Sequence, residues 1–385
     1  MVSAQLGGAT SSSPTLVEMI RTFRHGEFAA VDLVAAKGGQ VVSVCLPARN
    51  EEQSIAILLE SLAAQPERPA QIVVVDDQSD DRTSTIARGF PGVTVVDGEP
   101  VPEGWMGKAW ACQQGARLAS GSTLVFLDAD VRLGPGGLAA IVTEHGARGG
   151  LVSVQPFHTM RRAYERLSAL FNVIGFMGVG AASPGRDASS RGAFGPCLVT
   201  SRADYLDVGG HGSVRGEIVE DIALAGEYAR AGRPVHTFGG GDAVSFRMYP
   251  GGLGQLLEGW SKNFATGAGS VGFGRLFLIG FWLTTVLISV QYVIEQCLGR
   301  ADVPVAVAVL VYAMFAMQLG IMLRQLGNFG VLTAVLYPGP VGVFVAVFVH
   351  SAYLTLVRRQ VVWRGRRIPL SRSRRWAQAP AHHDE

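Results

Sequence analysis

Cysteine is scarce in this sequence, and its spacing suits neither a disulfide framework nor a zinc site. The 385 residues include four cysteines, and no two of them have the Cys-x-x-Cys spacing typical of zinc ligands. They are Cys45, Cys112, Cys197 and Cys297. We therefore expect reduced thiols in a cytosolic domain.

An excess of charge of one sign is also missing. Lys and Arg number 33 against 31 Asp and Glu, which gives a net charge of +2. Because nucleic-acid binding needs a broad basic face, this balance argues against a nucleic-acid partner. The arginines cluster only after the last apolar run, so residues 358–385 predict a basic tail that faces anionic lipid rather than a merely solvated one.

The first 38 residues lack a long apolar run. Arg21, Arg24 and Glu27 interrupt this stretch, and the apolar segment of a secretory signal peptide is not visible in it. We expect residues 1–38 to form a poorly specified leader.

Long apolar runs, by contrast, fill the C-terminal third. Hydrophobic residues make up 48% of the chain and concentrate in residues 276–293, 303–323 and 329–357. Each of the first two runs is about long enough to span a bilayer core, and two in succession make buried helices of a soluble protein the weaker alternative. Residues 271–357 therefore predict a transmembrane region with two to three membrane segments.

The third run leaves the number of crossings open, because Pro338-Gly339-Pro340 interrupts it. Three full crossings would put the basic tail on the opposite side from residues 39–270, against the positive-inside tendency. Either one run lies in the interface, or the interrupted run is a re-entrant hairpin. A further apolar segment, residues 167–182, is either an interfacial helix against the membrane or a core helix.

Residues 39–270 alternate between short, β-branched apolar runs and helical patterns. We expect one helix that Asn50 caps and another over residues 108–119. The expected strands are 41–47, 71–75, 93–97 and 123–130. This order predicts a doubly wound α/β sheet, in which ligands bind beyond the carboxyl ends of the strands.

Two carboxylates stand at the end of the last expected strand, in the pattern Asp128-x-Asp130. A hard divalent cation with oxygen ligands suits such a pair, and it commonly binds phosphate oxygens as well. The cation would neutralise the charge that grows on a departing nucleotide diphosphate. The pattern therefore predicts a metal site at Asp128 and Asp130.

A second acidic cluster begins with Asp76 and Asp77, where the strand 71–75 ends. One of these carboxylates would hydrogen-bond the base or ribose of a nucleotide. The alternative is a polar turn whose N-cap is Ser79 or Asp80.

Two lysines and a tryptophan are candidates for contact with the substrates. Lys108 is a candidate for phosphate contact. Trp260 and Lys262, just before the first apolar run, are either membrane-interface anchors or contacts to the acceptor and the diphosphate.

Glu220 and Asp221 open another expected helix. They either complement the helix dipole or supply a general base that removes a proton from the acceptor.

Four segments together resemble glycosyltransferase family 2, a family of inverting enzymes. They are PARNEE (47–52), VVVDDQSDD (73–81), LDAD (127–130) and VED (219–221). The resemblance implies that residues 39–270 form a catalytic domain of the GT-A type, the Rossmann-like fold of nucleotide-diphospho-sugar transferases. C-terminal transmembrane helices would follow this domain.

The resemblance also implies roles for individual residues. Asp128 and Asp130 would hold Mg²⁺ or Mn²⁺ and, through it, the sugar-nucleotide phosphates. Asp221 would be the catalytic base, with Glu220 as its rival. The residues expected to line the nucleotide pocket are Pro47, Arg49, Glu51 and Asp77.

Further segments, such as AFGPCLVT (193–200) and LLEGWSKNFATGAG (256–269), resemble membrane glycosyltransferases of carotenoid biosynthesis, with hopanoid-associated enzymes as the near alternative. The implied reaction moves a hexose, expected to be glucose from UDP-glucose, to a lipid-like acceptor such as a carotenoid carboxylate or hydroxyl. The implied location is the cell membrane, in a multi-pass protein with a cytoplasmic catalytic domain. Glu258 and Gly259 precede Trp260 where processive synthases have Gln-x-x-Arg, so processivity is not expected.

Two other classes of protein remain as alternatives. A membrane scaffold with a degenerate transferase fold would keep the apolar runs but perform no transfer. A soluble nucleotidyltransferase also uses paired carboxylates and a metal ion, but it has no use for the apolar third of the chain.

Overall fold

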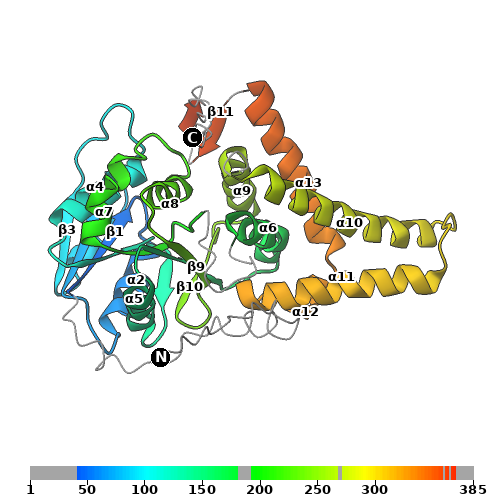
Figure 1. Ribbon diagram of the computed structural model, residues 1–385, viewed down its shortest axis with the longest axis horizontal. Helices are drawn as coiled ribbons and strands as arrows, with labels where there is room; N and C mark the ends of the chain where they lie inside the picture. Colours follow the sequence, from blue (N-terminus) through cyan, green and yellow to red (C-terminus); the bar gives the residue numbers. More distant parts are fainter. Residues whose placement is uncertain (1–40, 181–191, 268–270, 359, 364–365, 370–385) are drawn as a thin grey trace, which may run out of the picture.

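The computed structural model describes residues 41–180, 192–267, 271–358, 360–363 and 366–369 (Figure 1). The expected leader and most of the basic tail lie outside these residues. The described chain forms an α/β body at one end and a group of apolar helices at the other, from which a long helical hairpin projects (Figure 1).

A mixed sheet organises the α/β body, with the strand order β3-β2-β1-β4-β8-β6-β9. β8 runs antiparallel to both of its neighbours, whereas the other neighbouring pairs are parallel. The strands are β1 (Val42–Ala48), β2 (Gln71–Asp76), β3 (Val93–Asp97), β4 (Thr123–Leu127), β6 (Leu151–Gln155), β8 (Cys197–Ser201) and β9 (Val235–Gly239). The predicted α/β sheet is confirmed, and the expected strand over 123–130 ends early, at Leu127.

The register of the central strands brings their carboxyl ends to one edge. Ala48 at the end of β1 pairs with Asp76 at the end of β2, and Cys45 of β1 pairs with Phe126 near the end of β4. The residues that follow these three strands therefore share a rim of the sheet, which is where α/β sheets bind ligands.

Helices cover both faces of this sheet. α4, α7 and α8 lie on one face, and α2 and α5 lie on the other (Figure 1). The helices of the body are α2 (Ile55–Ala63), α3 (Thr83–Arg88), α4 (Gly107–Leu118), α5 (Gly137–Arg148), α7 (Arg202–Asp207), α8 (Glu220–Arg230) and the short 3₁₀ helix η3 (Gly210–Gly212).

The expected helix start at Asn50 is wrong. Asn50 has a φ of 54°, in the left-handed region that asparagine tolerates, and α2 begins only at Ile55. The Asn50 side chain instead accepts a hydrogen bond from the backbone N–H of Asp80 at 2.8 Å. This bond to the loop after β2 holds Asn50 outside the helix, so Asn50 does not cap α2.

A small sheet connects the rim to the apolar helices. It has the order β5-β10-β7, with β5 (Val131–Leu133), β7 (Phe157–His158) and β10 (Val244–Phe246). β5 starts directly after Asp130, and Phe246 of β10 pairs with both Val131 and His158.

The remaining elements form the apolar end of the molecule. They are η2 (Ala163–Ser168), α6 (Ala169–Val179), α9 (Leu253–Gly267), α10 (Phe273–Cys297), α11 (Val305–Leu326), α12 (Val331–Val335), α13 (Pro338–Tyr353), the π-helical turn η5 (Leu354–Arg358), β11 (Gln360–Trp363) and β12 (Arg366–Pro369). α10 and α11 are long and apolar enough to cross a membrane. Large side chains on both are exposed, for example Phe273 (85%) and Met317 (65%).

Both feet of the α10–α11 hairpin are attached to the same body. At the first foot, the Arg275 guanidinium donates to the carbonyl oxygen of Gly178 in α6 at 2.9 Å. At the second foot, the Asn328 side chain bonds the backbone N–H and carbonyl of Met160, at 2.5 and 3.2 Å. The hairpin therefore leaves the body and returns to it.

The third apolar run folds back as well. The Tyr337 hydroxyl, at the turn between α12 and α13, lies 2.6 Å from Ser289 Oγ, about 24 Å along α10 from its start. In the last turn of α13, Ser351 Oγ donates to the carbonyl oxygen of Ser261 in α9 at 2.8 Å. The third apolar run thus folds back along α10 and returns to α9.

Helix α6, in the segment 167–182, packs at the foot of the hairpin. Its residues Ala169 to Ile174 are buried, and Phe171 stacks on Trp260 of α9 at 4.9 Å between ring centroids. The first half of α6 is therefore a core helix between the body and the apolar helices.

Candidate active site

The rim of the sheet holds the predicted carboxylate pair. Asp128 directly follows β4, and its backbone N–H donates to the carbonyl oxygen of Pro196 at 3.0 Å. The chain then turns through Asp130 into β5, so both carboxylates stand where one strand ends and the next begins.

Lys108 connects three segments that are distant in sequence. Its Nζ lies 2.8 Å from Asp128 Oδ1 and 3.1 Å from Glu220 Oε1. Burial opposes the charge on Lys108, but these two carboxylates together hold the pKa of Lys108 well above its usual range. The rim therefore carries a fixed positive charge between two acids.

Asp221 is oriented by backbone amides. The N–H of Gly195 donates to Oδ2 at 2.6 Å, and the N–H of Ile222 donates to Oδ1 at 2.9 Å. Burial and the neighbouring Glu220 raise the pKa of Asp221 to about 6. A carboxyl group with a pKa near neutrality is suited to accept a proton.

Gly195 fits this site because it has no side chain. A Cβ at this position would lie 3.0 Å from Asp221 Oδ2 and 3.1 Å from Lys108 Nζ. We expect Gly195→Ala to displace both groups and to lower the rate of the catalysed reaction by roughly tenfold to a hundredfold, because small displacements of reacting groups cost that much. Initial rates and the melting temperature of the purified variant measure the effect.

Gly226→Ala is the matched control for this substitution. Gly226 lies in the same helix as Asp221, and a Cβ there would meet only the end of Arg230, at 3.9 Å. Its rate should stay within about twofold of the original, since the site has room for a Cβ and alanine favours a helix more than glycine does. An equal loss in both variants would contradict the placing of Gly195 against Asp221 and Lys108.

Negative charge accumulates around Asp130. Burial, followed by the charges of Asp128 and Glu51, raises the pKa of Asp130 to about 8. Burial likewise raises the pKa of Asp128, although Lys108 opposes this. When these carboxylates are ionised, they repel one another. A hard divalent cation with oxygen ligands fits such a cluster. Within the described ranges, no group of three or more His, Cys, Asp or Glu side chains is close enough to hold an ion by itself.

The expected nucleotide-binding residues lie along the ends of β1 and β2. Pro47 pairs with Val75 in the sheet, and Arg49 Nη1 lies 3.4 Å from Asp77 Oδ2. Asp77 also packs against the start of α4, since a Cβ on Gly107 would lie 2.7 Å from Asp77 Oδ2. The structure thus brings Arg49 and Asp77 together beside the helix that carries Lys108.

Asp76 and the residues after it also form a polar turn, which was the alternative to a nucleotide contact. Asp76 Oδ1 accepts a hydrogen bond from the Ser79 N–H at 3.2 Å. The N-cap position of α3 is Arg82, which makes no side-chain cap bond, and Asp81 Oδ1 just before it accepts from the Thr83 N–H at 2.9 Å. The expected cap by Ser79 or Asp80 is therefore wrong, because α3 begins only at Thr83, beyond the reach of either residue as its N-cap.

Trp260 is buried among aromatic side chains. It is 7% exposed, stacks on Phe171, and has its ring centroid 6.1 Å from that of Tyr249. Tyr249 lies on the side of Asp130, whose charge adds to burial in raising the pKa of Tyr249. Lys262 belongs to α9, but its side chain lies outside the described residues.

His211 is a neighbour of this site that sequence patterns did not assign to it. The side chain is buried, and its Nδ1 lies 2.8 Å from the Tyr205 hydroxyl, which donates to Gln113 Oε1 at 3.2 Å. Burial lowers the pKa of His211 to about 4, so the ring is neutral near pH 7. Its segment precedes Glu220 and forms a wall beside the Lys108 ion pairs.

Comparisons with known proteins agree with this geometry. The sequence profile of "Glycosyl transferase family 2" matches residues 43–177. The chain is 34% identical over 340 residues to the 4,4'-diaponeurosporenoate glycosyltransferases of Staphylococcus aureus strains MRSA252 and USA300, covering 86% of this chain and 89% of each relative.

A solved structure shares the fold. The mannosyltransferase PcManGT from Pyrobaculum calidifontis, in complex with GDP-Man and Mn²⁺, aligns with a TM-score of 0.53 and 18% identity. The alignment covers 89% of this chain and 95% of that one, so the likeness includes the helices beyond the α/β body.

Proposed function

Because this chain belongs to glycosyl transferase family 2 and is therefore a glycosyltransferase, we propose that it moves a hexose from a nucleotide-diphospho-sugar to a lipid-like acceptor at a membrane surface. The proposed acceptor is a carotenoid carboxylate, the chemistry in the name of its Staphylococcus aureus relatives. UDP-glucose is the proposed donor.

One observation supports the proposal most directly. Lys108 joins Asp128 and Glu220 at the carboxyl edge of the sheet, within the same body that holds both feet of the exposed apolar hairpin. A diphosphate leaving group needs positive charge at this edge, and a lipid acceptor needs the edge to stand beside a bilayer.

A divalent cation, Mg²⁺ or Mn²⁺, completes this proposal. Asp128 and Asp130 would hold it, since their clustered oxygens and the raised pKa of Asp130 fit a hard ion. Such ions are commonly held by one or two carboxylates together with substrate phosphates. When bound, the cation supplies charge that stabilises the departing diphosphate.

The remaining roles in substrate binding and proton transfer are proposed for side chains of this chain. Arg49 and Asp77 border the space proposed for the nucleotide. Lys108 provides a second positive charge for the phosphates. Glu220 orients Lys108 through their ion pair at 3.1 Å. Asp221 is therefore the better candidate for the base.

A hydroxyl acceptor, as in hopanoid or other lipid glycosylation, is the second candidate. The pKa of Asp221, raised to about 6, favours it because only a hydroxyl must lose a proton as it attacks. A carboxylate acceptor is already ionised at neutral pH and needs little help from a base.

The donor and acceptor are tested with isolated membranes that contain the full chain. A panel of labelled sugar nucleotides is supplied with a carotenoid carboxylic acid or a lipid alcohol, and the organic phase is extracted and analysed by mass spectrometry. We expect label from UDP-glucose in a carotenoid ester. Label in no lipid with any donor would support the degenerate scaffold instead.

The hairpin is proposed to cross the membrane twice, with the body on the cytoplasmic side. Arg275 and Arg324 lie at its feet, whereas its far end carries Glu295, Arg300 and Asp302. Positive charge at the feet and a net negative tip match the positive-inside tendency.

Cys297 provides a test of this orientation. It is exposed near the tip of the hairpin, whereas Cys45, Cys112 and Cys197 are buried in the body. We expect a membrane-impermeant maleimide to label intact cells through Cys297, with the label lost in Cys297→Ser. Labelling that requires permeabilised cells would reverse the proposed orientation.

A further inference from the structure

Three exposed arginines gather where the body meets the hairpin. Arg161 and Arg162 lie in the loop between β7 and η2, and Arg324 lies in the last turn of α11. The two places are joined directly, since Asn328, just beyond α11, bonds both backbone groups of Met160 at 2.5 and 3.2 Å. We call Arg161, Arg162 and Arg324 the arginine cluster.

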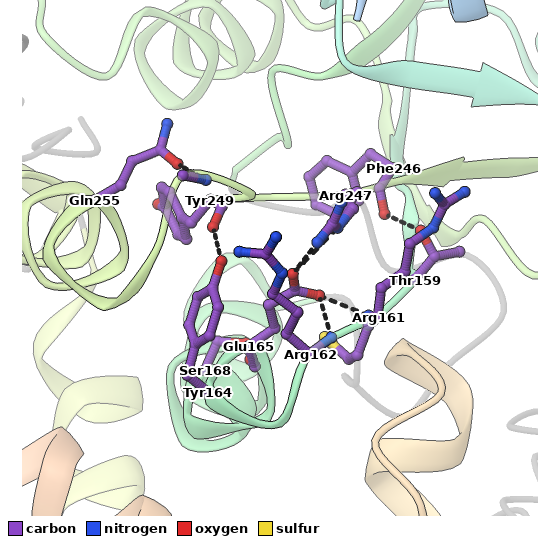
Figure 2. Close-up of polar contacts among 12 residues, drawn as sticks. Thr159, Arg161, Arg162, Tyr164, Glu165, Ser168, Phe246, Arg247, Tyr249 and Gln255 are labelled. Carbon is purple, nitrogen blue, oxygen red and sulfur yellow. Dashed lines mark hydrogen bonds and ion pairs between the residues drawn. The ribbon is translucent and has the colours of Figure 1, made fainter. Parts of the chain in front are cut away.

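The acid nearest to the cluster in sequence is already engaged. Glu165 is 2% exposed, and its Oε1 receives Arg247 Nε at 3.1 Å and Nη2 at 2.5 Å. Its Oε2 accepts the backbone N–H of Arg161 at 2.6 Å (Figure 2). Glu165 thus fixes the backbone of the loop, while its charge is balanced by Arg247.

The side chains of the arginine cluster form no ion pair within the described part of the chain. Next to them, α11 exposes Ile321 (53%) and Met317 (65%), about one and two turns before Arg324. If lipid tails cover these apolar side chains, the headgroup layer lies at the level of Arg324.

We propose that the arginine cluster binds the phosphate groups of anionic phospholipids in the leaflet that faces the body. This inference rests on the proposed membrane insertion of the hairpin. Guanidinium groups bind phosphate oxygens in a bidentate manner, and the cluster offers three without a competing carboxylate. Each basic residue near an anionic leaflet contributes a factor of about five to lipid association.

Phospholipid binding by the arginine cluster would also hold the active site at a fixed distance from the membrane surface. The loop that carries Arg161 follows β7, which pairs with β10, and β10 pairs with β5 directly after Asp130. One small sheet therefore separates the lipid contact from the proposed metal-binding residue.

The test counts the phospholipids that the purified chain retains. The full chain in a neutral detergent is incubated with equal amounts of phosphatidylglycerol and phosphatidylcholine, and bound lipid is counted by native mass spectrometry. We expect at least about fivefold enrichment of phosphatidylglycerol. The triple variant R161Q/R162Q/R324Q should retain the two lipids about equally.

A control variant removes the same charge elsewhere. R68Q/R88Q/R117Q changes residues of the α/β body, at the ends of α3 and α4 and in the loop before β2, and should keep the enrichment. The lysine variant R161K/R162K/R324K should keep most of it, because the charge remains. Inorganic phosphate at millimolar concentration should compete only weakly.

Three results would overturn the proposal. The first two are equal retention of both lipids by the original chain and undiminished enrichment in R161Q/R162Q/R324Q. The third is full competition by inorganic phosphate, which would show an anion site without lipid preference. Failure of the hairpin to insert is a separate result, since the chain would then remain soluble without detergent and Cys297 would be labelled only in permeabilised cells.

Discussion

Replacing both Asp128 and Asp130 by alanine should lower sugar transfer by about three orders of magnitude or more. The two carboxylates are the proposed holders of the divalent cation, and Asp128 also positions Lys108 at 2.8 Å. A bound cation contributes several kcal/mol of stabilisation to the transition state, and each 1.36 kcal/mol corresponds to about tenfold in rate. Release of nucleoside diphosphate from UDP-glucose by purified protein, at saturating Mg²⁺ or Mn²⁺, measures the loss.

The loss should occur without unfolding. Burial and neighbouring charges raise the pKa of Asp130 to about 8, above the value of an aspartate in an unfolded chain. A carboxyl group with a raised pKa favours folding while it is protonated, and its contribution is lost as the pH rises through about 8. Asp130→Asn should therefore melt at the same or a higher temperature at pH 8.5.

Asp97→Ala is the control for the paired substitution. Asp97 also stands at the end of a strand of this sheet, but its side chain is 81% exposed and pairs with Arg88. It should retain nearly full activity. If the paired Asp128 and Asp130 variant were as active as this control at saturating Mg²⁺ or Mn²⁺, the proposed metal site would be wrong.

The strands and the acidic residues at their ends were predictable from the sequence because both signals are local. The apolar β-branched runs 71–75 and 93–97 become strands within one residue of their expected bounds, and Asp76 stands at the carboxyl end of the first of them. The helix dipole at the start of α8 likewise agrees with Glu220 and Asp221 in its first turn.

The parts that were missed depend on contacts between distant segments. Asn50 is drawn out of the helix by a bond to Asp80, thirty residues away. Gly195 reaches Asp221 only because β8 inserts antiparallel between β4 and β6, which no local pattern indicates. Trp260 is buried against Phe171 of α6, and the sequence left open whether this helix is interfacial or part of the core.

The identity of the acceptor decides what Asp221→Asn does. With a lipid hydroxyl as acceptor, we expect a loss of about a hundredfold to ten-thousandfold, the usual contribution of a positioned general base. With a carotenoid carboxylate, the loss should stay within about threefold, because that acceptor is ionised before it attacks. The asparagine side chain can still accept the Gly195 N–H bond of 2.6 Å, so the site should remain assembled.

The pH dependence separates a base from a structural role. Burial and Glu220 raise the pKa of Asp221 to about 6, so transfer to a hydroxyl should fall as the pH drops below about 6 and Asp221 becomes protonated. Asp221→Asn should lack this descent and show a low, flat profile. Glu220→Gln should keep the descent, displaced to lower pH, and should mainly raise the KM for the donor, since Glu220 orients Lys108.

These outcomes also identify the natural acceptor. A descent below pH 6 with the native lipid extract, absent in Asp221→Asn, indicates a hydroxyl acceptor and a working base. A flat profile in both proteins with full activity indicates an acceptor that is already ionised. Full activity of Asp221→Asn on a purified lipid alcohol would leave Asp221 without a role as base, whatever the native acceptor is, because the proton of a hydroxyl must then be taken by another group.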